Sequence, residues 1–330
     1  MTQINFEKKQ TSISMVERVR SIVIHQIGKV QSILPRLVQI ESLLSPSKML
    51  RTKMAARLTK NHFELNPKTV EYYCAATELV HTASLCHDDV IDASLIRRAA
   101  PTLWRRTGQS AAILIGDLLL CQGIDLVLSL EESDKYLKNF IFKAKETCAA
   151  EAEQELIRRG RVLDKHTCIS LARRKTGSFF SFIGYLCGGD NLQFSLALEE
   201  AGYRIGTAYQ LADDLIDIYG QEHLSGKTLG TDTARGKFTM ADANSDSDIR
   251  VCISKLCQSA LDILNDWPFA REALDEFYMR DLQPVLDKQK LGISIKSFFN
   301  KDFSIHSQID NSLLSSSPRN SSHRQKMNFL

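Results

Sequence analysis

The chain has 330 residues, of which 43% are hydrophobic and 25% are charged, an ordinary balance for a soluble globular protein. Its net charge of +3 is too small to indicate a nucleic-acid-binding protein. No uninterrupted apolar run approaches the roughly 18 residues that span a bilayer, so we expect no transmembrane segment.

The amino terminus has no continuous apolar stretch of the kind found in secretory signals. The eight cysteines show neither a CxxC pair nor a metal-binding spacing, and this favours buried reduced thiols. We therefore expect a cytoplasmic protein. A mitochondrial presequence stays open, although Glu7 and Glu17 argue against it.

A first helical segment is predicted in residues 1–45. Apolar residues recur at helical spacing from Met15 to about Leu44, and Pro35 kinks or ends this run. The basic stretch 47–53 follows. Its Lys48 and Arg51 suit phosphate recognition, because arginine offers two parallel hydrogen bonds and lysine a point charge. By itself such a stretch is more typical of a solvated basic face.

The next predicted helix begins near Pro67 and carries a group of acidic residues at its end. Asp88 and Asp92 share one helix face, with Asp89 beside them; we call these three the first aspartate cluster. Three neighbouring carboxylates repel each other, so we expect a cation between them, and Mg²⁺ prefers such oxygen ligands. His81 lies on the same stripe, where a histidine is as often a core residue as a ligand.

Three further stretches separate this cluster from its counterpart. Arg97 and Arg98 lie in a loop before Pro101, and arginines at a helix end can also simply bind carbonyl groups. Helices are predicted at Gln109–Leu128 and over 133–160. The following helical stretch, Asp164–Cys187, contains Lys175 and Thr176.

The predicted helix 191–219 carries a second aspartate cluster, made of Asp213, Asp214 and Asp217, with Gln210 on the same stripe. A loop rich in glycine and lysine follows, with Lys227 and Lys237. Glycines permit a close approach to phosphate, and lysines supply positive charge. Residues 239–248 are polar and turn-like; helices are expected over 249–264 and 269–286, and a disordered tail over 288–330.

The two aspartate clusters resemble the two aspartate-rich motifs of the trans-isoprenyl diphosphate (polyprenyl) synthase family, over about Ser47 to Met240 and more weakly to Asp287. The resemblance implies a single all-α bundle around a central cavity, in residues 46–287. It also implies a homodimer that condenses isopentenyl diphosphate with an allylic diphosphate (dimethylallyl, geranyl or farnesyl), using Mg²⁺, up to about three ions per site.

The resemblance implies a role for each candidate residue. Isopentenyl diphosphate would bind Lys48, Arg51, His81 and Arg98; the allylic diphosphate would bind Arg97, Lys175 and Lys227. Mg²⁺ would bind Asp88, Asp92 and Asp213. The resemblance also implies catalytic roles for Asp89, Asp214 and Asp217. It implies substrate-binding roles for Thr176, Gln210 and Lys237.

The sequence departs from the family pattern at Met49 and Thr52, where family members carry arginine and proline, and it is shorter after Thr239 by roughly a helix. Small residues, Ala83 and Ser84, lie one turn before Asp88, and this predicts a product of C20 or longer. Two alternatives stay open: a class I terpene cyclase, and a non-catalytic subunit of a heteromeric prenyl synthase.

Overall fold

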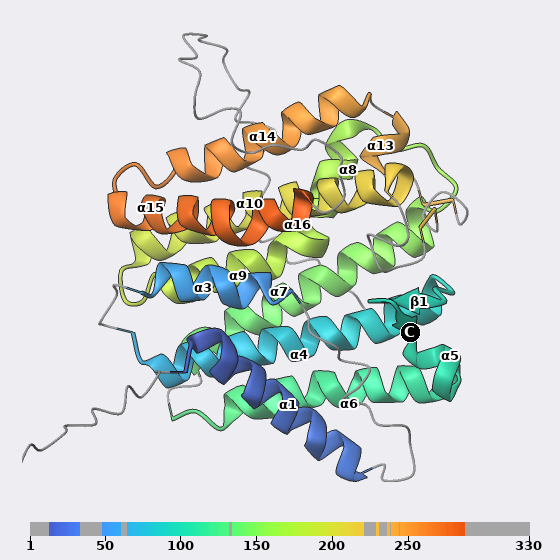
Figure 1. The fold of residues 1–330 in the computed structure, drawn as a ribbon, viewed down its shortest axis with the longest axis horizontal. Coiled ribbons are helices and arrows are strands. Elements are labelled where there is room, and N and C mark those ends of the chain that lie inside the picture. The colour runs from blue at the N-terminus through green and yellow to red at the C-terminus, as the bar shows by residue number, and fades with distance from the viewer. Residues whose placement is uncertain are drawn as a thin grey trace, which may run out of the picture.

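The computed structural model describes residues 13–33, 48–60, 65–131, 134–220, 229–230, 236–237, 239–243 and 245–287. Five helices form most of the bundle, and Figure 1 shows most of the long ones running along the longest axis of the molecule. They are α4 (Pro67–Ile91), α6 (Gln109–Leu128), α7 (Asp134–Ala152), α9 (Ser178–Cys187) and α10 (Leu192–Tyr219).

The other elements close the bundle. Before α4 lie α1 (Met15–Ile33) and α3 (Leu50–Leu58), and α4 is followed by a two-stranded hairpin that pairs Ile96 with Pro101 and Arg97 with Ala100. The remaining elements are β1 (Ile96–Arg97), β2 (Ala100–Pro101), α5 (Leu103–Thr107), η1 (Glu153–Arg158), α8 (Lys165–Ala172), η2 (Arg173–Gly177), α13 (Met240–Ala243), α14 (Asp246–Asp262), α15 (Pro268–Phe277), η3 (Tyr278–Leu282) and α16 (Gln283–Asp287).

The all-α prediction is therefore confirmed, and most predicted helices match the observed ones within a few residues. Residues 239–248 are an exception, because they include the short helix α13 and the start of α14. The predicted segment boundary at 45–46 and the tail over 288–330 lie outside the described residues.

Local sequence signals fix where the two site-bearing helices begin. The side chain of Asn66 accepts a hydrogen bond from the backbone N–H of Lys68, and Pro67 occupies the first position of α4. Asn191 caps α10 in the same way through the N–H of Phe194. These caps satisfy donors that a helix start leaves unpaired, so each helix has a defined register.

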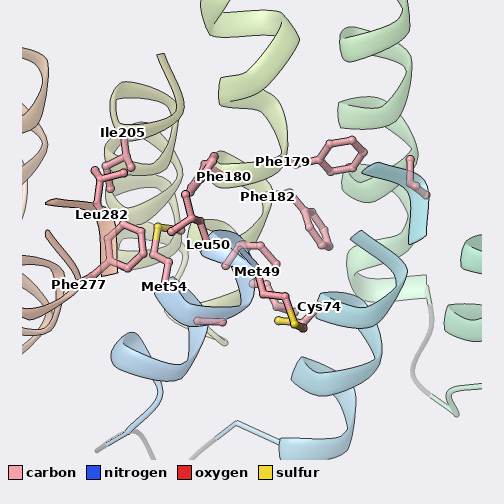
Figure 2. Close-up of a cluster of buried hydrophobic side chains, with 14 of the residues drawn as sticks. Met49, Leu50, Met54, Cys74, Phe179, Phe180, Phe182, Ile205, Phe277 and Leu282 are labelled. Atoms are coloured by element: carbon pink, nitrogen blue, oxygen red, sulfur yellow. The ribbon is translucent and has the colours of Figure 1, made fainter. Parts of the chain in front are cut away.

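The core explains one departure from the family pattern. Met49, where the resemblance leads us to expect an arginine, is 4% exposed and lies in the same buried cluster as Cys74 and Phe182 (Figure 2). It precedes α3 in a left-handed conformation with φ of 47°. An apolar side chain at this position thus joins the hydrophobic core, while its neighbours Lys48 and Arg51 keep their charges.

Among the described helices, α6 is long and apolar enough to cross a membrane, by length and composition only. The run is interrupted by Asp117 and Asp125. Helix α6 packs along α4, and the ring Nε2 of His87 on α4 lies 3.1 Å from the carbonyl oxygen of Ile113 on α6. We therefore interpret α6 as a helix of the bundle.

Candidate active site

The first aspartate cluster lies at the carboxy-terminal end of α4, where a tight hairpin folds the chain back on it. The hairpin places Ala93, Arg98 and Ala99 at positive φ, and Thr102 and Trp104 both donate hydrogen bonds to the carbonyl oxygen of Ser94. This reversal brings Arg97 onto Asp89.

Arg97 and Asp89 form a buried charge pair. Nε and one terminal nitrogen of Arg97 lie 2.8 and 2.7 Å from the same oxygen of Asp89, which is 4% exposed. A buried carboxylate needs such a partner, because an unpaired charge is costly to bury. Asp89 therefore binds Arg97, whereas Asp92 binds Lys237.

Lys237, which lies far from the first aspartate cluster in the sequence, places a positive charge beside it. Its Nζ lies 2.7 Å from Asp92 and 3.1 Å from Glu151, and its side chain is 1% exposed. Because Gly236 has a φ of 69°, the chain can turn sharply just before this lysine. The lysine ammonium thus occupies the kind of position, between two carboxylates, that a cation would take.

Glu151 joins the two lysines of the site and was not among the predicted site residues. Its other oxygen lies 2.5 Å from Nζ of Lys175, which also donates to Gln154 at 3.3 Å. The sequence signal that could have identified Glu151 as a site residue is its spacing from Gln154 on a predicted helix. Two π-helical turns, η1 and η2, lie directly after Glu151 and around Lys175, and such turns are frequent at functional sites.

The acidic groups of this site differ in their affinity for protons. Burial, followed by the charges of Glu151 and Asp92, raises the pKa of Asp88 from 3.8 to about 7. Burial alone would raise the pKa of Glu151, but Lys175 and Lys237 outweigh it and lower that pKa. An added cation would therefore favour the ionised form of Asp88.

The second aspartate cluster lies on α10 and meets η2. Gln210 donates a 2.8 Å hydrogen bond to Asp214 and accepts one from Thr176. The two backbones touch here: a Cβ on Gly206 would lie 2.5 Å from the Cα of Gly177. Only glycine permits this approach, which holds η2 against α10.

The pKa of Arg97 is affected by carboxylates of both aspartate clusters. Burial by itself would lower its pKa, but the hydrogen bond to Asp89 and the charges of Asp89, Asp88 and Asp213 outweigh burial and raise the pKa. Asp217 is 5% exposed, and its carbonyl oxygen accepts from the N–H of Gly230 at 3.1 Å. Members of both clusters, Asp89 and Asp88 of the first and Asp213 of the second, therefore influence the same arginine.

A basic cluster, made of Lys48, Arg51, His81 and Arg98, lies beside the acidic region. Burial, followed by the charges of Arg51, Arg98 and Arg97, holds the pKa of His81 well below its ordinary value. The imidazole is therefore neutral, and it can bind an anion only as a hydrogen-bond donor.

Two aromatic residues complete the basic cluster, and the sequence did not single them out. The Tyr209 hydroxyl accepts a 3.2 Å hydrogen bond from Lys48, and the Arg51 guanidinium lies 5.1 Å from the ring centre of Phe180. Nε of Arg51 is buried with no hydrogen-bond partner. A buried arginine with an unused donor is prepared for an anionic ligand.

Lys227 lies outside the described residues, so its predicted role is not assigned a position. In the described part of the chain, no three metal-ligating side chains converge closely enough to hold a metal ion by themselves. Asp88 and Asp92 nevertheless suit a divalent cation that takes its remaining ligands from other groups of the site and from a phosphate, as Mg²⁺ commonly does.

Comparison with known proteins was made on the whole chain. A sequence model described as polyprenyl synthetase matches residues 37–244. The chain is 31% identical over 194 residues to a geranylgeranyl diphosphate synthase of Mycobacterium tuberculosis, covering 56% of this chain and 55% of the relative. It is 29% identical over 176 residues to a heptaprenyl diphosphate synthase component 2 of Bacillus subtilis, covering 52% and 50%. The matches thus span about half the length of these relatives.

Solved structures with the same fold include a geranyltransferase from Helicobacter pylori complexed with magnesium and isoprenyl diphosphate. It superposes with a TM-score of 0.63 at 21% identity, covering 80% of this chain and 98% of that one. At this identity the likeness establishes the fold.

Proposed function

Because the chain belongs to the polyprenyl synthetase family, we propose that it is a prenyltransferase that condenses isopentenyl diphosphate with an allylic diphosphate. The observation that carries the proposal is the adjacency of two differently charged sites, joined by Arg97 and Arg98. One holds carboxylates together with lysines, and the other holds a buried arginine with an unused donor.

The allylic diphosphate is assigned to the acidic site. Asp88, Asp92 and Asp213 would hold Mg²⁺, which supplies Lewis-acid stabilisation of the leaving diphosphate when bound. Lys175, Lys237 and Arg97 add fixed positive charge where negative charge develops as the allylic C–O bond breaks. Such preorganised charge needs no rearrangement at the moment of reaction.

Isopentenyl diphosphate is assigned to the basic cluster. Arg51 and Arg98 bind its phosphates, Lys48 contributes a further charge, and neutral His81 donates a hydrogen bond. The terminal alkene carbon of isopentenyl diphosphate then bonds to the allylic carbon as diphosphate leaves. The positive charge then lies on the substituted alkene carbon, and a proton lost from the methylene group next to that carbon passes to the released diphosphate, so that a new double bond forms and the charge balances.

We also propose a product of C20 or longer. Ala83, on the face of α4 one turn before Asp88, is 2% exposed and offers only a methyl group to its surroundings. A growing chain that runs beside α4 meets no bulky side chain at this residue.

A homodimer is the quaternary state we propose, with α6 as the interface. Ile113, Leu114 and Leu128 on this helix are 43%, 61% and 54% exposed, which is unusual for a helix this apolar. A second chain would bury this row. A heteromer is the second candidate, because one relative is named as a component of a synthase.

The test is incubation of the purified protein with Mg²⁺, labelled isopentenyl diphosphate, and geranyl or farnesyl diphosphate, followed by chromatographic sizing of the extracted products. Elongated products are expected, and Asp92→Asn should remove them while Asp190→Asn, an exposed surface variant, should not. No incorporation by a folded protein would refute the proposal. Release of a volatile hydrocarbon from the allylic substrate alone would identify a cyclase instead.

A further inference from the structure

The two most exposed large apolar side chains of the described residues lie in one short segment, together with a third that is more than half exposed. Leu156 is 81% exposed, Val162 75% and Ile157 54%. They belong to residues 156–162, Leu-Ile-Arg-Arg-Gly-Arg-Val, which finish η1 and turn at Gly160 with a φ of 72°. Three arginines accompany them: Arg158 and Arg159 form ion pairs with Glu153 and Glu155 of η1, and Arg161 is exposed.

This segment lies at the edge of the candidate active site. The N–H of Gly160 donates a 2.7 Å hydrogen bond to the carbonyl oxygen of Gly236, and the next residue, Lys237, binds Asp92. In Figure 1 the end of α7 that leads into η1 and the hairpin labelled β1 lie at the same end of the molecule.

The hairpin repeats the same combination of side chains. Leu95 and Ile96, just after Asp92, are 44% and 41% exposed, and Arg105 and Arg106 on α5 are exposed as well. We call the exposed apolar residues of both segments the site-edge patch: Leu95, Ile96, Leu156, Ile157 and Val162. Arginines flank the patch on both sides of the first aspartate cluster.

We propose that the site-edge patch docks on an anionic membrane surface. Aliphatic side chains that alternate with arginines match the boundary of a bilayer, where acyl chains meet anionic headgroups. Nucleic-acid surfaces would select arginine with aromatic stacking residues, and the patch has no aromatic member.

The docking itself stands on exposure and charge alone. Its use, the transfer of a long apolar product directly into the bilayer, rests on the proposed function. The acidic site lies between the two segments of the patch, so a docked protein would bring that site close to the lipid.

The experiment is flotation of the purified full-length chain with vesicles of phosphatidylcholine and phosphatidylglycerol, compared with vesicles of phosphatidylcholine alone. Binding to the anionic vesicles is expected, and added salt should weaken it. Leu156→Asp should lower the partition coefficient about tenfold or more, and Arg161→Glu about fivefold or more. Both side chains are exposed, and thermal unfolding checks that both variants remain folded.

Leu192→Asp is the matched control. Leu192 is 62% exposed and begins α10, and the second aspartate cluster starts at Asp213, about 30 Å further along the helix at about 1.5 Å per residue. This variant should bind vesicles like the unaltered chain.

Three results would overturn the proposal. The first is no binding of the unaltered chain to anionic vesicles. The second is binding by Leu156→Asp and Arg161→Glu that equals binding by the unaltered chain. The third is binding of a labelled oligonucleotide in place of vesicles. Prenyl transfer measured without vesicles is a separate readout. If the unaltered protein showed no prenyl transfer in this assay, the proposed function would be refuted, and the result of the vesicle-binding experiment would still hold.

Discussion

The contact between Gly206 of α10 and Gly177 of η2 provides a direct test of how Lys175 and Thr176 are positioned. A Cβ added by Gly206→Ala would lie 2.5 Å from the Cα of Gly177 and 2.9 Å from the carbonyl oxygen of Thr176. Carbon atoms normally approach to about 3.5–4.0 Å, so η2 must move by about 1 Å. A displacement of this size can lower kcat about 100-fold.

The same substitution also has a cost in stability. Overpacking typically costs about 1–3 kcal/mol, which for a chain of this length corresponds to a fall of roughly 2–5 °C in Tm. Gly184→Ala is the matched control: its Cβ would meet the carbonyl group of Leu198 where α9 packs on α10, further from Lys175 along the chain.

Steady-state kinetics of prenyl transfer and thermal unfolding should be measured on both variants. We expect a similar loss of stability in both and a selective loss of kcat in Gly206→Ala. Equal kcat in the two variants would show that the contact does not position the catalytic lysine.

Three further predictions concern single residues. Lys237→Met removes the ammonium group between Asp92 and Glu151, so kcat/KM for the allylic diphosphate should fall about 100-fold; an unchanged value in steady-state assays would contradict its role. Because the pKa of Asp88 is raised to about 7, a cation must displace its proton at lower pH. Calorimetric Mg²⁺ affinity, with a diphosphate analogue bound, should therefore fall about tenfold per pH unit below about 7, with proton release. Ala83→Phe should shorten the product, and an unchanged chromatographic size would remove the argument from Ala83.

Much of the fold could be predicted because hydrophobic spacing and helix signals agree along the chain. The predicted bounds of α6 are the observed ones, and those of α10 differ by one residue. Pro67 and the asparagine caps mark helix starts that are local features of the sequence. The two aspartate clusters could be found in the same way, since each lies within a few residues of a single helix.

Contacts between distant segments could not be read from such local patterns. The bond between Lys237 and Asp92 joins residues 145 positions apart, and that between Lys48 and Tyr209 joins residues 161 apart. Glu151 shows the same difficulty, because its importance comes from two lysines on other elements. A π-helical turn also gives no periodic signal of its own, so η1 and η2 were predicted as ordinary helix.

Helix α10 contributes residues to both substrate sites and so fixes how they lie relative to each other. Tyr209 contacts Lys48 of the basic cluster, while Gln210 binds Thr176 and Asp214 on the acidic side. Each residue advances the helix by about 1.5 Å and turns it by about 100°. Inserting or deleting one residue between Tyr209 and Asp213 would rotate one set of ligands away from the other. This part of the chain can therefore vary in side chains during evolution, but not in length.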